Sequence, residues 1–254
     1  MQGEAVKSVQ VFSPKHDAWT AGPDLPEPVH HAALVSADDQ LYLIGGYAGS
    51  SFTQPTAAVR RFDPSARRWV DAPALPQPRA AGAAAWDGKR IVYGGGVGPD
   101  GVVGEVYALE GGAWRAIGAL SRPREHLGAA SDGQGRVWLL GGREGGLDRN
   151  LATVDLVEGG KVRLLGELPT PRGGVAAFWS GSGACLAGGE QPTGTLGAVE
   201  CINANGDVVE FPPLSVPRHG LGAAVVDGVA YTLLGGPKPG LSVSGTVEAL
   251  PLGG

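Results

Sequence analysis

The sequence has little of what holds small scaffolds or metal centres together. Two of its 254 residues are cysteine, which is too few for a disulfide framework or a four-thiolate zinc site. No run of 18 apolar residues occurs, and the opening segment, residues 1–7, is polar. We therefore expect neither a membrane-spanning segment nor a signal peptide.

Charge is also scarce. Asp, Glu, Lys and Arg make up 18% of the chain, and 20 basic and 25 acidic residues give a formal net charge of -5. A chain with this net charge lacks the excess of basic residues that binds nucleic acid or an anionic membrane. We expect neither of them as a partner.

Glycine and proline are abundant instead. The chain has 44 glycines and 20 prolines, and in a helix interior these residues cost about 1 and about 3 kcal/mol relative to alanine. This composition argues against an all-helical protein. Because 43% of the residues are apolar, the chain can bury a core, and we expect a folded, turn-rich protein rather than a disordered one.

Internal repeats indicate the architecture. A glycine pair follows an apolar run five times, and the first glycines of the pairs are 49, 47, 47 and 47 residues apart. The pairs begin at Gly45, Gly94, Gly141, Gly188 and Gly235. A proline and a strand of small residues precede each pair, and a polar loop and a strand opening on valine follow it. A fourth stretch, centred on a tryptophan in some units, completes four short strands per unit.

Turn signals connect the first and second strands of a unit. Asp87-Gly88, Asp132-Gly133 and Asp227-Gly228 are dipeptides that accept the backbone of tight hairpins. Each unit is therefore predicted to be a four-stranded antiparallel meander, and a period of about 47 residues predicts a β-propeller. The expected fold class is all-β, with a single propeller of four-stranded antiparallel blades over residues 1–254.

The repeated residues resemble Kelch repeats. The resemblance lies in the glycine pair, the Pro-Arg opening, the segment Phe62-Asp63-Pro64 followed by Trp69, and the Leu-Pro ending, and it covers essentially the whole chain. WD-type propellers match less well, because the Trp86-Asp87 pair sits in a hairpin turn. In Kelch substrate adaptors, arginines at the matching blade openings contact acidic peptides, so the resemblance implies a ligand-binding propeller.

The two ends of the chain leave the number of blades open. Residues 8–26 match the third and fourth strands of a unit, whereas the last unit, from Pro217, provides the first three. We expect five blades, closed by the N-terminal strand that carries Trp19, which would complete the C-terminal blade. The alternative is a six-bladed propeller with an incomplete N-terminal blade.

The candidate ligand site follows from the order of the strands. The loop entering the first strand and the loop between the second and third strands lie on the same face of such a meander. This face gathers the arginines of the Pro-Arg openings, which are Arg79, Arg124, Arg172 and Arg218, whereas Val29 stands in that place in the first unit. Neighbouring candidates are His30, His31, Glu125, His126 and His219 near the openings, and Tyr47, Arg143 and Glu190 after the glycine pairs.

Four guanidiniums at one channel mouth suit carboxylates and other oxyanions. We therefore predict a monomeric binding module for a protein partner or a small acidic ligand. The other interpretation is that the arginines pair internally and hold the blades together.

The sequence carries no recognisable catalytic motif. A nucleophile elbow, a phosphate loop and a nucleotide fingerprint are not found, and we expect no cofactor. A metal site needs three converging ligands, whereas His30, His126 and His219 come from separate units, so we expect none. The alternative function is a carbohydrate-acting enzyme similar to the sialic-acid mutarotases, which are Kelch propellers, with Glu125 and His126 as an acid/base pair.

The two cysteines lie on the second and third strands of one unit. The positions of Cys185 and Cys201 fit a direct cross-strand pair. We expect two buried, reduced thiols rather than a disulfide, because a cytoplasmic chain stays reduced. The sequence as it stands indicates the cytoplasm, and a secreted or periplasmic location is the alternative if the N-terminus is incomplete.

Overall fold

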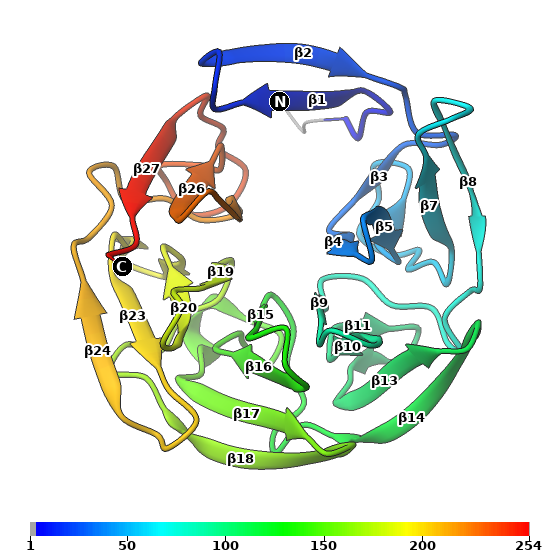
Figure 1. Ribbon diagram of the computed structural model, residues 1–254. Coiled ribbons are helices and arrows are strands. Elements are labelled where there is room, and N and C mark those ends of the chain that lie inside the picture. Colours follow the sequence, from blue (N-terminus) through cyan, green and yellow to red (C-terminus); the bar gives the residue numbers. More distant parts are fainter. Residues whose placement is uncertain (1–3, 254) are drawn as a thin grey trace.

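The computed structural model describes residues 4–253, which form antiparallel strands arranged in a ring around a central axis (Figure 1). An N-terminal hairpin comprises β1 (Val9–Ser13) and β2 (Ala18–Gly22). Four four-stranded blades follow. The first comprises β4 (Ala33–Ala37), β5 (Gln40–Ile44), β7 (Val59–Asp63) and β8 (Arg68–Ala72), and the second comprises β9 (Ala83–Trp86), β10 (Ile91–Gly94), β13 (Glu105–Glu110) and β14 (Ala113–Ala119). The third comprises β15 (Gly128–Ser131), β16 (Arg136–Leu140), β17 (Thr153–Glu158) and β18 (Lys161–Glu167), and the fourth comprises β19 (Ala176–Trp179), β20 (Ala184–Ala187), β23 (Val199–Ile202) and β24 (Val208–Phe211).

The fifth blade has three strands, β25 (Gly222–Val226), β26 (Val229–Leu233) and β27 (Val247–Pro251). Short elements lie in the loops of the blades, namely β3 (Val29–His30), β6 (Tyr47–Ala48), β11 (Val97–Gly98), β12 (Gly101–Val102), β21 (Glu190–Gln191), β22 (Gly194–Thr195) and the 3-10 helix η1 (Leu147–Arg149). Within every blade the strands are hydrogen-bonded in chain order. The predicted all-β propeller with antiparallel blades, five in number, is confirmed.

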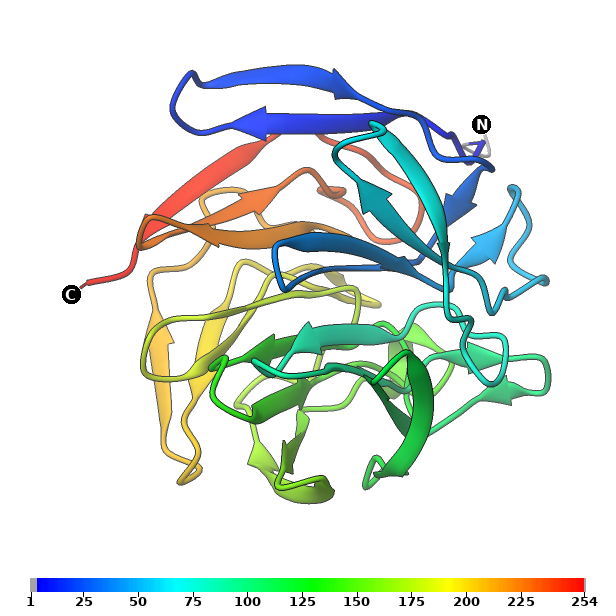
Figure 2. The ribbon, with the colours of Figure 1, turned by 45° about the vertical axis from the view of Figure 1, so that its right-hand side comes forward.

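The predicted closure of the ring is wrong. Strand β2 does not join the sheet of β27; it pairs with β1, from Val9 opposite Gly22 to Ser13 opposite Ala18. Figures 1 and 2 both show this hairpin, in blue, beside β27, in red. Two strands joined by a tight turn close a short loop at little entropic cost, and this favours their mutual pairing over the pairing of β2 with the distant β27.

Aromatic side chains fix the hairpin against the fifth blade. The Phe12 ring lies 5.1 Å from Trp19 across the hairpin and 6.2 Å from Tyr231 of β26, measured between ring centroids. The hairpin and the five blades therefore form one continuous ring of packed sheets at the rim.

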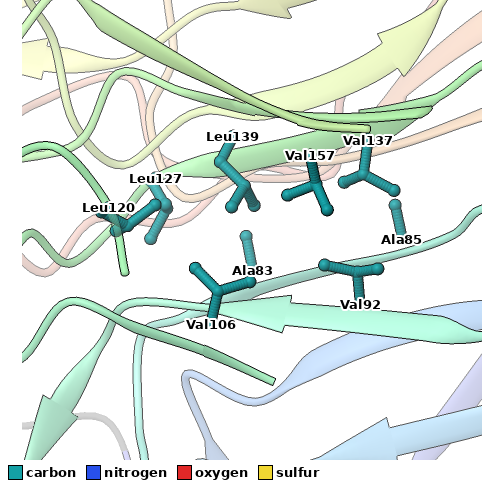
Figure 3. Close-up of a cluster of buried hydrophobic side chains, with 9 residues drawn as sticks. All are labelled: Ala83, Ala85, Val92, Val106, Leu120, Leu127, Val137, Leu139 and Val157. Carbon is teal, nitrogen blue, oxygen red and sulfur yellow. The ribbon is translucent and has the colours of Figure 1, made fainter. Parts of the chain in front are cut away.

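Small and branched apolar residues build the core between blades. Figure 3 shows the cluster between the second and third blades, in which alanines and valines of β9, β10 and β13 face Val137, Leu139 and Val157 of β16 and β17. Alanine recurs on the innermost strands, as at Ala83 and Ala85. Because alanine has a short side chain, neighbouring sheets approach closely near the axis.

The glycine pairs connect each blade to the next. The second glycine donates a backbone hydrogen bond of 2.8–2.9 Å to the carbonyl of the arginine that opens the following blade. These bonds run from Gly46 to Arg79, from Gly96 to Arg124, from Gly142 to Arg172 and from Gly189 to Arg218. The second blade therefore uses Gly95 and Gly96, with φ of 67° and 102°, rather than the predicted pair that begins at Gly94.

A second set of backbone bonds forms an inner belt around the axis. The residue three positions after each opening proline has a left-handed φ of 54–67°, and these residues are His31, Ala81, His126, Gly174 and Gly220. From Ala81 onward, each donates its N–H to the carbonyl of the preceding member over 2.7–3.0 Å. We call these five residues the inner belt, and it joins all five blades.

Tryptophan burial differs from one blade to another. Trp69 is buried, and its Nε1 donates to the Pro23 carbonyl at 3.1 Å. Trp114 is partly buried and packs against the core cluster of the first and second blades. The tryptophan with no exposed surface is Trp138 of β16.

The predicted cross-strand position of the two cysteines is confirmed, whereas their predicted reduced state is wrong. Cys185 of β20 lies directly opposite Cys201 of β23, and the two form a disulfide rather than the expected thiols. Both side chains are buried between the fourth and fifth blades. Their position on adjacent antiparallel strands brings the sulfurs within bonding reach.

Reduction of this disulfide is expected to lower the free energy of unfolding by about 3 kcal/mol, the value for a closed loop of about 15 residues. The two cysteines are 16 positions apart. Urea unfolding with and without a reducing agent measures the difference. A double variant, Cys185→Ala with Cys201→Ala, controls for the reagent, because its unfolding should not respond to reduction. Equal stability of the oxidised and reduced wild type would contradict the prediction.

Candidate functional site

The four arginines of the Pro-Arg openings are buried inside the blades. Arg124, Arg172 and Arg218 have no exposed surface, and Arg79 is also buried. Each guanidinium forms an ion pair with a carboxylate on the third strand of its own blade. The pairs are Arg79–Glu105 at 3.0 Å, Arg124–Asp155 at 2.7 Å, Arg172–Glu200 at 2.7 Å and Arg218–Glu248 at 3.2 Å.

Arg124 shows what these side chains do in the fold. Its Nε donates to the Gly141 carbonyl at 2.7 Å and its Nη2 to the Leu139 carbonyl at 2.9 Å, where the second strand of the blade ends. Burial lowers the pKa of Arg124, and the adjacent Asp155 carboxylate acts in the opposite direction. The guanidinium therefore satisfies carbonyls beside the glycine pair through charge-assisted hydrogen bonds.

The first blade lacks both members of this pair. Val29 stands in the arginine position, and Arg60 stands where the third, fourth and fifth blades place a carboxylate, one residue after the valine that opens the third strand. Arg60 instead pairs with Glu27 and Asp71. The first blade thus lacks the arginine and its carboxylate together, which is expected if the two side chains serve as an ion pair within the blade.

The acidic partners could have been found in the sequence. The signal is an acidic residue directly after the valine that opens the third strand, as in Val154-Asp155, Val199-Glu200 and Val247-Glu248. Of the two interpretations of the arginines, internal pairing is the one that the contacts support. Direct contact of these four side chains with a ligand stays a prediction, and their burial speaks against it.

A charged cluster does form at the loop end of the channel. Arg143 bridges two blades, since its Nε donates to Glu125 at 2.8 Å and its Nη1 to Glu190 at 2.9 Å. His126 Nδ1 contacts Glu125, and His219 Nδ1 lies 3.5 Å from Glu190. These five residues, which we call the axial cluster, come from the third, fourth and fifth blades.

The axial cluster holds its neighbours in place. Glu190 accepts a 3.0 Å hydrogen bond from the Gly240 N–H, and its backbone carbonyl accepts one of 2.7 Å from Asn150 Nδ2. Two carboxylates face one guanidinium in the cluster. The formal charge at the channel mouth is therefore negative whenever the histidines are neutral.

An aromatic group continues the cluster toward the first blade. The His31 ring lies 4.9 Å from His126 and 4.9 Å from His30, measured between ring centroids. Tyr47 and Phe52 lie 5.3 Å and 4.6 Å from His30. We call His30, His31, Tyr47 and Phe52 the aromatic group.

The structure thus brings together most of the predicted site. The axial cluster and the aromatic group contain every predicted site residue except the four arginines. Phe52 was not predicted, because a single aromatic residue in a variable loop has no counterpart in the other repeats. His126 and His219, which come from separate blades, are linked through Glu125, Arg143 and Glu190.

Burial lowers the pKa of two histidines of this region, His31 and His126. Burial is the largest cause, and together with the nearby His30 and Arg143 it lowers the pKa of His31 to about 4. Burial also places the pKa of His126 well below its ordinary value, with Arg143 acting in the same direction. Protonation of either ring therefore opposes the folded arrangement.

Acid is expected to destabilise the protein through His31. The pKa is about 4 in the folded chain and about 6.5 in the unfolded chain, so the unfolded chain binds the proton first as the pH falls below 6.5. Between pH 7.5 and pH 4.5 this group alone removes about 2 to 3 kcal/mol of stability. Urea unfolding at the two pH values measures the loss.

The matched variants are His31→Asn and His16→Asn. Asparagine tolerates the φ of 56° at position 31, and His16 lies exposed in the N-terminal hairpin. The first variant should lose less stability in acid than the wild type, and the second should behave like the wild type. Equal acid sensitivity of all three proteins would assign the effect to other groups.

Residues 4–253 lack two further features. Within residues 4–253, no group of three or more His, Cys, Asp or Glu side chains is arranged to hold a metal ion. No helix in that range has the length and apolar character needed to cross a membrane.

Comparisons with known proteins give a consistent result. A family model described as the Kelch motif matches residues 28–76. Human Kelch-like protein 34 is 32% identical over 155 residues, and the match covers 56% of this chain and 24% of that protein. The Kelch-like protein terF of Aspergillus terreus is 26% identical, and the match covers 94% of this chain and 57% of that protein. The chain thus spans only part of these relatives.

A solved structure shows the same fold. The structure of YjhT superposes with a TM-score of 0.80 and 15% sequence identity, covering 96% of this chain and 88% of that one. At this identity the likeness concerns the fold alone.

Proposed function

Because the chain is a Kelch-repeat β-propeller, we propose that it is a monomeric, single-domain binding module for a protein partner. Its ligand face is the loop end of the channel, formed by the aromatic group and the axial cluster. The resemblance to Kelch repeats supports a protein partner, and the contacts at this end support the choice of face.

The observation that carries the proposal is the position of Phe52. Its side chain is 49% exposed, yet its ring packs on His30, His31 and Tyr47. Aromatic side chains held in a fixed orientation at an exposed surface are common anchors of protein interfaces. The aromatic group thus offers a preorganised apolar anchor beside polar groups.

A second loop extends this face. Leu241 and Val243 of the fifth blade are exposed, Val243 by 92%, and their loop is tied to Glu190 through the Gly240 N–H. The axial cluster therefore connects two loops that carry exposed apolar side chains. Exposed apolar residues gathered at a polar rim are characteristic of protein-binding surfaces.

The acidity of the ligand is a separate prediction. It was based on four guanidiniums, and all four are neutralised by carboxylates within their blades. Arg143 is the predicted arginine that lies at the channel mouth, where Glu125 and Glu190 hold it. The geometry therefore supports recognition through apolar and hydrogen-bonding groups better than recognition of an acidic ligand.

The enzymatic alternative has weaker support. Glu125 and His126 are in contact, as an acid/base pair would be, but Glu125 is buried and its second oxygen is bonded to Arg143. A sugar would have to reach a carboxylate that is already engaged on both oxygens. Proton NMR of N-acetylneuraminate with and without the protein tests this alternative through the rate of anomerisation.

A peptide-display selection on the purified protein tests the proposed function. Selected peptides should bind Phe52→Ala at least tenfold more weakly than the wild type. They should bind Leu164→Ala like the wild type, because Leu164 is an exposed residue of the outer strand β18. Enrichment of Asp and Glu among the peptides would support an acidic ligand. Peptides that ignore the Phe52 substitution would place the ligand face elsewhere.

A further inference from the structure

A cavity of about 210 Å³ lies between the fourth and fifth blades. Phe178 of β19 and Val199 of β23 line it on one side, and β26 and β27 line it on the other, together with residues 212–215 of the linker between the two blades. An apolar cavity of about 150 Å³ already holds benzene. The space between these blades therefore admits a six-membered ring that carries a further substituent.

Thr232 distinguishes this interface from its counterparts. On β26 it stands in the register that Leu139 and Leu186 occupy in the third and fourth blades, opposite the carboxylate that pairs with the opening arginine. Both leucines are without exposed surface and belong to the apolar clusters between their blades and the preceding ones. The fifth blade thus lines its interface with a shorter side chain and a hydroxyl group where the other two blades have leucine.

Thr232 and Glu248 form a polar wall of the cavity, and the Arg218 guanidinium joins them. Its Nη2 donates to Thr232 Oγ1 at 3.0 Å and lies 3.2 Å from Glu248 Oε1. Arg218 has no exposed surface, yet its Nε and Nη1 have no hydrogen-bond partner among the described residues. The equivalent Arg124 uses all three of its nitrogens. Because buried N–H groups without partners cost free energy, hydrogen-bonding capacity remains unused beside this wall.

The charges of this wall select a neutral ligand. Burial acts to raise the pKa of Glu248, but hydrogen bonds from Ser215 and Val216 and the charge of Arg218 lower it below its ordinary value. Glu248 is therefore ionised at neutral pH, and its charge is balanced by that of Arg218. A charged ligand would add an unbalanced charge to a largely apolar cavity, which is unfavourable.

The apolar wall of the cavity is held in place by the disulfide. Phe178 and Val199 pack in one cluster with the two bonded cysteines. Leu214 and Leu250, which are partly buried, pack against the same cluster and also line the cavity. A wall that is fixed before binding lowers the cost of ordering when an apolar group enters.

We propose that this cavity binds a small neutral molecule with an aromatic or branched apolar part and one amide or hydroxyl group. The apolar part contacts Phe178, Val199 and Leu250. The polar group accepts a hydrogen bond from the Thr232 hydroxyl, whose oxygen already accepts one from Arg218, and donates one to Glu248. Neither the axial cluster nor the aromatic group lines the cavity, so this site is independent of the ligand face proposed above.

Benzamide is the probe, because it joins a six-membered ring to one amide group. Titration of the methyl-labelled protein, followed by NMR, should shift the methyl signals of Val199, Leu214 and Leu250 saturably, and these methyls should show nuclear Overhauser effects to the benzamide ring protons. Benzoate, of nearly equal size, should bind at least tenfold more weakly at pH 7, because it is charged and has no N–H group for Glu248. The proposal fails if benzamide causes no saturable shift up to its solubility limit, or if its ring protons contact only other methyls.

Variants at position 232 test the polar wall. Thr232→Leu introduces the leucine of the third and fourth blades, fills part of the cavity and removes the hydroxyl, so it should bind benzamide at least tenfold more weakly. Thr20→Leu, the same change at an exposed position of β2, should bind like the wild type, and Thr232→Ser, which keeps the hydroxyl, should retain most of the affinity. Unchanged binding by Thr232→Leu would overturn the proposal. If that variant does not fold, the contacts of benzamide with the wild-type methyls still decide the question.

Discussion

Replacing Arg124 with alanine is expected to lower the free energy of unfolding by about 3 to 5 kcal/mol, the cost of breaking a buried ion pair by removing one partner. Asp155 would remain without exposed surface and without its counter-ion. The Gly141 and Leu139 carbonyls would lose their donors as well. Urea unfolding followed by tryptophan fluorescence measures the loss.

Arg122 provides the matched control, because it is two residues away and its pair with Glu144 is exposed. Arg122→Ala should cost at most about 1 kcal/mol. The double variant Arg124→Met with Asp155→Leu should recover much of the loss, because it leaves no buried charge uncompensated. A loss below 1 kcal/mol for Arg124→Ala, with weaker ligand binding, would restore the interpretation of these arginines as ligand contacts.

Trp138→Ala is expected to cost about 3 to 5 kcal/mol, the range for a large aromatic residue in a core. The side chain has no exposed surface and packs in the cluster between the third and fourth blades, with the Trp179 ring 5.0 Å away. Its removal leaves a cavity that two β-sheets cannot close without moving apart. Chemical unfolding of the variant measures the effect.

Two substitutions test the reason for this cost. Trp138→Phe should be far milder, because the indole Nε1 is buried without a hydrogen-bond partner among the described residues, so no hydrogen bond is lost. Trp19→Ala, at an exposed position of the N-terminal hairpin, should cost about 1 kcal/mol or less. Similar losses for Trp19→Ala and Trp138→Ala would show that burial does not set the effect.

The blades were predictable because each depends on local patterns repeated five times. Each unit has a glycine pair, a proline opening and a strand that begins with valine, at nearly constant distances. The period therefore remains recognisable even where one unit departs from the pattern. The exact glycines were less predictable. Gly94 to Gly96 form a run of three in the second blade, and only the backbone conformation shows that the last two make the turn.

The surroundings of the site were harder to predict because they depend on pairs distant in sequence. The arginine period was visible, but whether a guanidinium faces ligand or carboxylate depends on Asp155, which is 31 residues from Arg124. Trp138 lies on a second strand, where no tryptophan recurs in the other units, so the repeat does not mark it as a core residue. Ring closure was wrongly predicted because strand counting does not weigh the pairing of β1 with its neighbour β2 against that of β2 with β27.

The Cys185–Cys201 disulfide also bears on where the chain is stable. A bond of this kind persists in an oxidising compartment, whereas glutathione and thioredoxin keep thiols reduced in the cytosol. The disulfide therefore stabilises the fold only in an oxidising medium. In a reducing medium the fourth blade would rely on its packing and its strand pairing, and the protein would be more readily unfolded and degraded there.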